Sequence, residues 1–181
     1  MENLSNPTIS QFKAFESAYD YFNERLFDDQ LPPVILNLSR KSKAMGFVAP
    51  FRWRKAEDEK GKGNIHELSI NPEILAMSLI EVYSTLVHEQ AHIWQYTHGT
   101  PSRNGYHNKE WADKMLAVGL IPSDTGKEGG NMTGQNMSDY PEKDGVFLEA
   151  LEEMPDSFKL PFVSIEGDMR LKLTTGITED G

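Results

Sequence analysis

Apolar side chains recur at steps of three and four residues near the start of the chain. They are Phe12, Phe15, Tyr19, Phe22 and Leu26. This spacing places them along one face of an α-helix, so we expect a helix over residues 10–27 after a loose leader of residues 1–9. Thr8 and Gln11 are placed to form a capping box at the start of that helix.

Three short extended runs follow this helix. Residues 34–39 come after a double proline, residues 46–53 combine apolar and aromatic side chains, and residues 65–70 alternate between apolar and polar positions. Alternation with a period of two is typical of a strand with one buried face. The charged run 54–64 contains two glycines and is typical of a surface loop. Together the runs predict a small antiparallel or mixed sheet.

Signals for helix starts and stops dominate the middle of the chain. Asn71, followed by a proline and an acid, predicts a short helix. Ser78 and Glu81 have the spacing of a capping box, and Gly99 provides a stop directly after His98. These signals predict that the main helix of the protein opens after Ser78 and ends at His98.

Beyond this helix the pattern is less regular. Another helix is expected over residues 108–118, with Gly119 as its stop. Residues 121–145 are rich in Gly, Asn, Ser, Thr and Asp, which predicts a long irregular segment. A short helix over 146–154 and a β-hairpin within 162–173 complete the prediction, which is that of an α+β fold.

Composition narrows the possible chemistry. The 181-residue chain contains no cysteine and carries a formal charge of −10. Without cysteine there is no disulfide or thiolate metal site, so a metal site must use histidines and carboxylates. The acidic charge argues against tight non-specific binding of nucleic acid. We find no apolar run long enough for a membrane span and no signal-peptide pattern, and therefore expect a cytoplasmic protein.

The decisive motif is the run His88-Glu89-Gln90-Ala91-His92, inside the predicted main helix. Histidines four residues apart lie on one helical face, one turn apart, so both imidazoles reach a single metal ion. Glu89 lies beside the metal, where it accepts a proton from a metal-bound water. Because zinc lowers the pKa of such a water towards about 7, the motif predicts peptide-bond hydrolysis with Glu89 as general base.

A catalytic zinc site needs a third protein ligand and keeps its fourth position open. Spacing ranks three candidates: His107 first, Glu110 second and His98 third. His107 and Glu110 follow His92 by 15 and 18 residues, at the start of the next predicted helix. His98 lies on the same helix as His92, too far along it to reach back to the metal.

Supporting residues are also predicted. Glu81, Glu110 and Asp113 are candidates to accept hydrogen bonds from the ligand imidazoles, because bound histidines commonly donate their other N–H to a carboxylate. Arg103 and Tyr106 are candidates to stabilise the oxyanion that develops during amide hydrolysis.

Further aromatic positions are assigned to the framework. Trp94 and Trp111 are expected to be core that holds the two site helices together. His66 is expected to be structural and to lie on the exposed side of its strand.

Four segments carry a resemblance to a known family. They are residues 22–27, residues 31–32, residues 86–92 with the sequence LVHEQAH, and residues 105–111 with the sequence GYHNKEW. Over residues 12–120 the chain resembles the SprT-like family of zinc metallopeptidases, which includes the Spartan-type DNA–protein crosslink proteases.

The resemblance implies both a site and a fold. It makes His88, His92 and His107 the ligands of one zinc ion per chain and Glu89 the catalytic residue. The implied fold is a zincin-like α+β domain, with an N-terminal helix, a small sheet of about three strands, the active-site helix and a following helix.

We assign residues 1–120 to this domain and residues 121–181 to an irregular C-terminal extension packed on or near it. Within the extension, residues 123–140 resemble family variants from phages and mobile elements. Many members carry a cysteine zinc ribbon and Spartan-type members add DNA-binding elements, but this cysteine-free, acidic chain shows neither. The expected partner is a protein substrate, and only the resemblance suggests DNA-associated proteins.

The leading hypothesis is therefore a zinc-dependent metallopeptidase. The alternative is a non-catalytic module, stabilised by zinc, with a binding or regulatory role in DNA metabolism or transcription. A closed site with Glu110 as fourth ligand would favour this alternative, whereas the presence of Glu89 favours the enzyme.

The zinc content of purified variants tests the ligand ranking. We expect about one zinc per chain in the wild type, in Glu110→Ala and in Glu89→Gln. His107→Ala should lose the metal, because only two ligands remain. Zinc is measured by mass spectrometry after gel filtration, and loss in Glu110→Ala with retention in His107→Ala would reverse the ranking.

Overall fold

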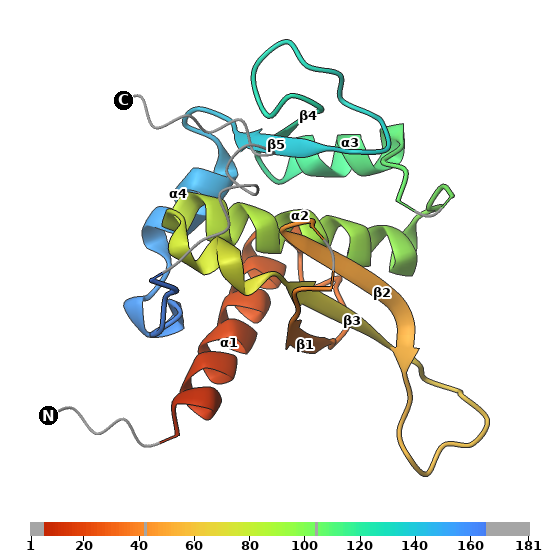
Figure 1. Cartoon of the computed structure of the whole chain (residues 1–181). Helices are drawn as coiled ribbons and strands as arrows, with labels where there is room; N and C mark the ends of the chain where they lie inside the picture. Colours follow the sequence, from red (N-terminus) through yellow and green to blue (C-terminus); the bar gives the residue numbers. More distant parts are fainter. Residues whose placement is uncertain (1–5, 42, 104, 166–181) are drawn as a thin grey trace, which may run out of the picture.

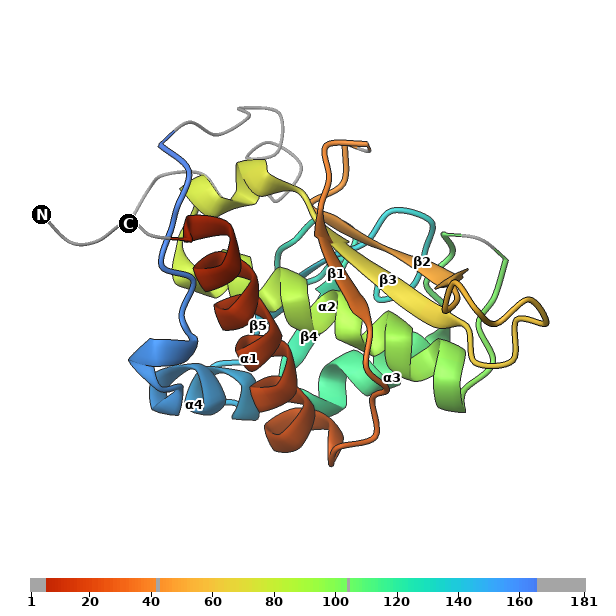
Figure 2. The ribbon, with the colours of Figure 1, turned by 90° about the horizontal axis from the view of Figure 1, so that it is seen from below.

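The fold is built around one long helix. The computed structural model describes residues 6–41, 43–103 and 105–165. Helix α2 (Leu79–His98) crosses the middle of the molecule (Figure 1). A three-stranded sheet and α1 (Pro7–Phe27) lie on one side of it, and α3 (Lys109–Ala117) lies on the other side with a two-stranded sheet (Figures 1 and 2). The architecture is the predicted α+β fold, and no helix in the described ranges has the length and apolarity needed to cross a membrane.

The larger sheet is mixed and has the strand order β1-β3-β2. β1 (Ile35–Leu38) runs parallel to β3 (Ile65–Ile70), and β2 (Gly46–Trp53) runs antiparallel to β3 at the edge of the sheet. The bounds of β2 and β3 are those predicted from the sequence. The register pairs Gly46, the first residue of β2, with Ile70, the last residue of β3. Both β2 and β3 contact α2.

Helix α1 begins three residues earlier than predicted. Pro7 occupies its first turn and Asn6 precedes it, so Thr8 is already helical and the predicted capping box is wrong. A proline suits this position because its fixed φ is already helical and it has no N–H to satisfy. The Gln11 side chain instead exchanges two hydrogen bonds, of 2.9 and 3.0 Å, with the backbone of Phe162.

Aromatic rings join three helices into one core. Phe22 of α1 is fully buried, with its ring centroid 5.8 Å from that of Tyr83 on α2. It lies 6.0 Å from the ring of Phe147, which belongs to α4 (Val146–Glu153). The stripe predicted on α1 is therefore core packing.

Predicted caps fix where the next helices start. Ser78 Oγ accepts a hydrogen bond of 3.3 Å from the Glu81 backbone N–H, and the Glu81 carboxylate accepts one of 2.8 Å from the Ser78 backbone N–H. The short helix predicted at Asn71 is a 3-10 helix, η1 (Pro72–Ala76), capped by the Asn71 side chain. Because the capping box sets the first residue of α2, it also sets which positions of that helix face the core.

The segment expected to be irregular, residues 121–145, contains a second sheet. β4 (Leu120–Ser123) and β5 (Ser138–Pro141) pair in antiparallel fashion, and β5 packs against α2. Strands of four residues that are separated by a long polar loop have too few alternating positions to be recognised in the sequence. The first strand of the predicted hairpin is not formed, because residues 162–165 contain no strand. Its second strand, residues 169–173, lies outside the described residues.

The aromatic core generates a stability prediction. Phe22→Ala should lower the free energy of unfolding by roughly 3–5 kcal/mol, since it removes a fully buried ring. Ile9→Ala is the control on the same helix, because Ile9 is 65% exposed, and it should change the free energy by less than about 0.5 kcal/mol. Urea unfolding followed by circular dichroism makes the measurement, and equal effects would contradict this account of the core.

Candidate metal centre

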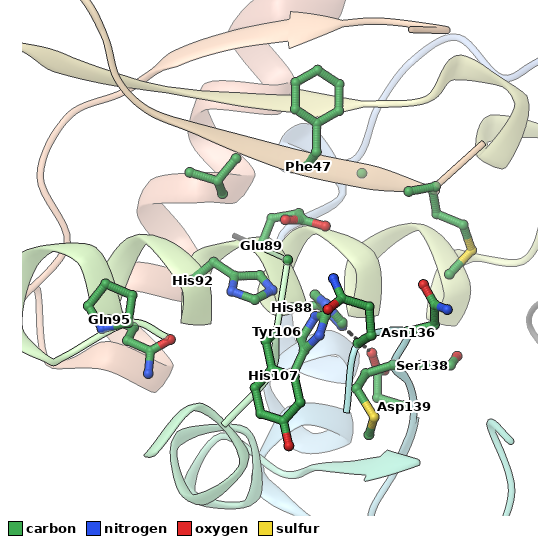
Figure 3. A pocket seen from close by; sticks show the side chains of 18 of the residues that line it. Phe47, His88, Glu89, His92, Gln95, Tyr106, His107, Asn136, Ser138 and Asp139 are labelled. Atoms are coloured by element: carbon green, nitrogen blue, oxygen red, sulfur yellow. Dashed lines mark hydrogen bonds and ion pairs between the residues drawn. The ribbon is translucent and has the colours of Figure 1, made fainter. Parts of the chain in front are cut away.

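Three histidines converge at one point beside α2. His88 and His92 come from α2, and His107 lies just before α3 (Figure 3). One nitrogen of each imidazole lies within 4.8 Å of the others, and the ring centroids are 4.7 to 5.5 Å apart. In the described part of the chain, this is the one group of three His, Asp or Glu side chains close enough to share a metal ion.

The two lower-ranked candidates for third ligand have other partners. Glu110 Oε1 accepts hydrogen bonds from the Gln95 side-chain amide at 2.8 Å and from the Thr100 backbone N–H at 2.7 Å. His98 Nε2 donates to the Gln30 carbonyl at 2.7 Å. Neither side chain belongs to the histidine cluster, so the geometry favours His107 as the third member.

Backbone pairing brings His107 to the cluster. The His107 N–H donates to the Gly134 carbonyl at 2.8 Å, and the Gly134 N–H returns a bond of 3.1 Å. The turn before it uses Gly105 at φ 75°, where a Cβ would lie 2.6 Å from the Gln135 side-chain amide. Asn108 then caps α3 through a 3.1 Å bond to its backbone, so the loop, the bridge and the cap together place the imidazole.

In two of the imidazoles, the Nδ1 atom has a hydrogen-bond partner outside the cluster. His88 Nδ1 lies 2.8 Å from Asp139 Oδ2, an interaction drawn as a dashed line in Figure 3. His107 Nδ1 lies 3.2 Å from the Gly134 carbonyl oxygen. In each ring the Nδ1 atom is therefore engaged, and Nε2 is the nitrogen that remains for a metal.

The acid beside His88 is not one of the three predicted from the sequence. Glu81 belongs to the capping box of α2, and Glu110 accepts a hydrogen bond from the Thr100 backbone N–H just after α2. Asp113 pairs with Lys109 at 2.7 Å. Asp139 was missed because it lies on β5, inside the segment predicted to be irregular. No local signal marks it, since its role depends on how β5 packs against α2.

Trp111 forms the apolar support of the three imidazoles. Its side chain is fully buried, and its ring centroid lies 4.4 to 5.3 Å from each of the three histidine rings. Trp111 is thus the core residue predicted from the sequence, and it limits the orientations that the imidazoles can adopt. Trp94, predicted with it, is partly buried and packs against the same core.

His66 lies outside the cluster, as predicted, but on the wrong side of its strand. Only 3% of it is exposed, and its Nδ1 accepts a 3.1 Å hydrogen bond from the Phe51 backbone N–H. It alternates with Leu68 and Ile70, which are buried in the core, so the side of β3 that faces α2 includes one polar position.

Glu89 faces the start of β2. A Cβ on Gly46 would lie 2.9 Å from both Cγ and Oε1 of Glu89, so only glycine leaves space for this carboxylate. Figure 3 shows Glu89 directed towards β2, while Phe47 points away from the histidines. Local sequence does not reveal this contact, because it joins two elements across the sheet–helix interface.

A pocket of about 670 Å³ opens onto the histidines and Glu89. One wall is the start of β2 with the residues before it, and the opposite wall combines the loop before α3 with residues 135–139. Arg103 and Tyr106, the two predicted oxyanion candidates, both line it, with the guanidinium 5.1 Å from the tyrosine ring centroid.

Comparison with known proteins identifies the family. Residues 15–128 match the SprT-like family. The chain belongs to the SprT-like family. A Salmonella typhimurium protein named "Uncharacterized protein in mucB 3'region" is 39% identical over 43 residues, which cover 24% of this chain and 58% of that protein. No solved structure matches the chain significantly.

The family match gives the site its chemical class and covers only part of the residues that surround the histidines. SprT-like membership indicates a zincin-like domain of the metallopeptidase type. The match ends at residue 128, whereas Gly134 and Asp139 lie beyond it. In this SprT-like protein, the segment after the matched region therefore forms part of the wall of the site.

Burial controls the protonation of the SprT-like site. Burial, followed by the charge of His88, lowers the pKa of His107 to about 4, and burial with the two neighbouring imidazoles lowers the pKa of His92 well below its usual value. For His88, burial lowers the pKa, but the hydrogen bond to Asp139 and nearby negative charges outweigh it and leave it raised. Burial raises the pKa of Glu89 to about 7, which suits a group that exchanges protons near neutral pH.

The contact between Gly46 and Glu89 is tested by a double-mutant cycle in the presence of a chelator. Gly46→Ala should lower the free energy of unfolding by about 1–3 kcal/mol, because the new methyl group overlaps the glutamate side chain. In a Glu89→Ala background the same change should cost less, with a coupling free energy above roughly 0.5 kcal/mol. Urea unfolding of the four proteins gives this value, and simple additivity would show that Glu89 does not restrict position 46.

Proposed function

We propose that this SprT-like protein is a zinc-dependent metallopeptidase that hydrolyses peptide bonds of protein substrates. One observation carries the proposal: a buried carboxylate, Glu89, adjoins three converging imidazoles at the wall of an open pocket. Membership of a family associated with metallopeptidase activity supports it.

The histidine cluster fits zinc. Imidazole nitrogen is a preferred zinc ligand, and three protein ligands with one open position are typical of catalytic zinc. Because His88 and His107 engage their Nδ1 atoms elsewhere, both rings offer Nε2 in the neutral form that binds a metal. We propose His88, His92 and His107 as the ligands of one zinc ion. When bound, zinc would supply a Lewis acid that polarises the peptide carbonyl and activates water.

Glu89 supplies the proton transfers. The residue is 5% exposed, and burial brings its pKa to about 7, so it both accepts and releases a proton near neutral pH. In the proposed reaction Glu89 accepts the proton of the attacking water. It then donates this proton to the leaving amine nitrogen.

The pocket walls would hold the substrate. Among the residues that the structure describes, strand β2 pairs only with β3, so its outer edge offers backbone groups to an extended peptide. Across the pocket, Arg103 and Tyr106 present a guanidinium and a phenol, and we propose that one of them stabilises the oxyanion. A volume of about 670 Å³ holds a short extended segment, which favours unfolded or loop regions of a protein as substrate.

The non-catalytic alternative has less support. It requires a closed zinc site, yet the Glu110 carboxylate is held by Gln95 and Thr100 and does not join the histidine cluster. DNA-associated proteins remain candidate substrates on the basis of the family alone. The formal charge of −10 gives no support for their delivery by direct DNA binding.

Cleavage of an unfolded protein tests the proposed function. Zinc-loaded wild type should cleave fluorescently labelled casein, and a chelator should stop the reaction. Glu89→Gln should keep its zinc but lose roughly 10²–10⁴-fold in rate, because the amide cannot transfer the proton. The matched control is Glu24→Gln on the exposed face of α1, which should retain full activity.

Two outcomes would contradict the proposal. One is cleavage by Glu89→Gln at the wild-type rate. The other is a zinc-loaded wild type that leaves casein and a varied peptide library intact.

A further inference from the structure

Asp139 is a buried carboxylate with one imidazole as its hydrogen-bond partner. Its side chain is 6% exposed, and its Oδ2 lies 2.8 Å from His88 Nδ1. Burial of an unpaired carboxylate is costly, so the protein stabilises this one through a donor. The donor is the first histidine of the HExxH motif, and the contact spans 51 residues of sequence.

The contact selects one tautomer of His88. A neutral imidazole carries one N–H and one lone pair. With the proton on Nδ1 and donated to Asp139, the lone pair lies on Nε2, the nitrogen available to the histidine cluster. The opposite tautomer would place a lone pair against the carboxylate and an N–H where the metal would bind. The negative charge also makes the ring a stronger ligand.

The same stretch of chain holds a second imidazole. Gly134, five residues before Asp139, accepts from His107 Nδ1 at 3.2 Å and bridges the His107 backbone in both directions. The stretch is itself anchored by the β4–β5 pairing, which joins Pro122 to Asp139 and Leu120 to Pro141. Residues 134–139 therefore orient two of the three histidines from outside the SprT-like match.

We propose that Asp139 is a positioning residue of the metal site, which holds His88 in the tautomer and orientation that present Nε2 to zinc. The segment after residue 128 is then an integral part of the site and not an accessory extension. This inference rests on the zinc site of the proposed function, but it does not require peptidase activity.

Zinc affinity of the full-length chain, measured by competition with a chromogenic chelator, is the first test. Asp139→Ala should weaken zinc binding by about 10–100-fold, the usual effect of removing an outer-shell partner. Asp139→Asn keeps an acceptor oxygen without the charge and should fall between Asp139→Ala and the wild type. Asp124→Asn is the matched control: it makes the same change just after β4, at an exposed side chain bonded to Asn131, and should bind zinc like the wild type.

A metal-free measurement separates positioning from general stability. Nitrogen-15 NMR of the imidazoles is recorded on the apo protein at a pH above the raised pKa of His88, so that this ring is neutral. With His88 assigned through His88→Gln, the spectrum should show the proton on Nδ1 in the wild type and in Asp124→Asn. In Asp139→Ala the Nε2–H form should appear. A merely structural role of Asp139 would lower thermal stability without changing the tautomer, and if Asp139→Ala does not fold, Asp139→Asn carries both measurements.

The outcomes distinguish this inference from the proposed function. Equal zinc affinity in wild type, Asp139→Asn and Asp139→Ala would overturn the positioning role and leave the peptidase intact. Zinc binding that depends on Asp139 in a protein without peptidase activity would overturn the proposed function alone. A wild type that binds no zinc would overturn both.

Discussion

The rest of the fold depends on the burial of α2 between two layers. Its central residues contact the larger sheet, α1, α3 and β5, yet several of them are polar. Burying a polar group is costly unless it has a hydrogen-bond partner. Gln90 accordingly donates to the Tyr19 carbonyl at 2.8 Å, and Gln95 donates to Glu110. The same requirement pairs His88 with Asp139, so the partners that keep α2 buried also build the site.

Glu89 shows how the packing produces reactivity. The carboxylate occupies the space left by the missing side chain of Gly46, where burial raises its pKa to about 7. A solvent-exposed glutamate would remain ionised at neutral pH and would be a weaker base. The glycine at the start of β2 therefore contributes to the chemistry by leaving room for the Glu89 side chain, without providing a functional group.

The three histidines are held from two directions. Trp111 packs under all three rings, and residues 134–139 hold the outer nitrogens of two of them. A site held in this way loses little entropy when it orders around a metal ion. Of these two supports, only Trp111 belongs to the region that matches the SprT-like family, which ends at residue 128.

The sequence by itself determined the local features and the core of the motif. The capping box sets the start of α2, alternation sets the bounds of β3, and the HExxH spacing places His88 and His92 on one helical face, because each of these depends on neighbours within a few residues. Spacing ranked His107 ahead of Glu110, and the fold brings it to the cluster.

Only the tertiary structure decided what depends on distant pairing. The β4–β5 sheet, the inward position of His66 and the contact of Asp139 with His88 all arise between segments far apart in the chain. Four-residue strands carry too little periodicity to be recognised. An acid in a polar segment likewise shows no partner until the backbone folds back, which is why the residue that orients the first histidine was found in the structure and not in the sequence.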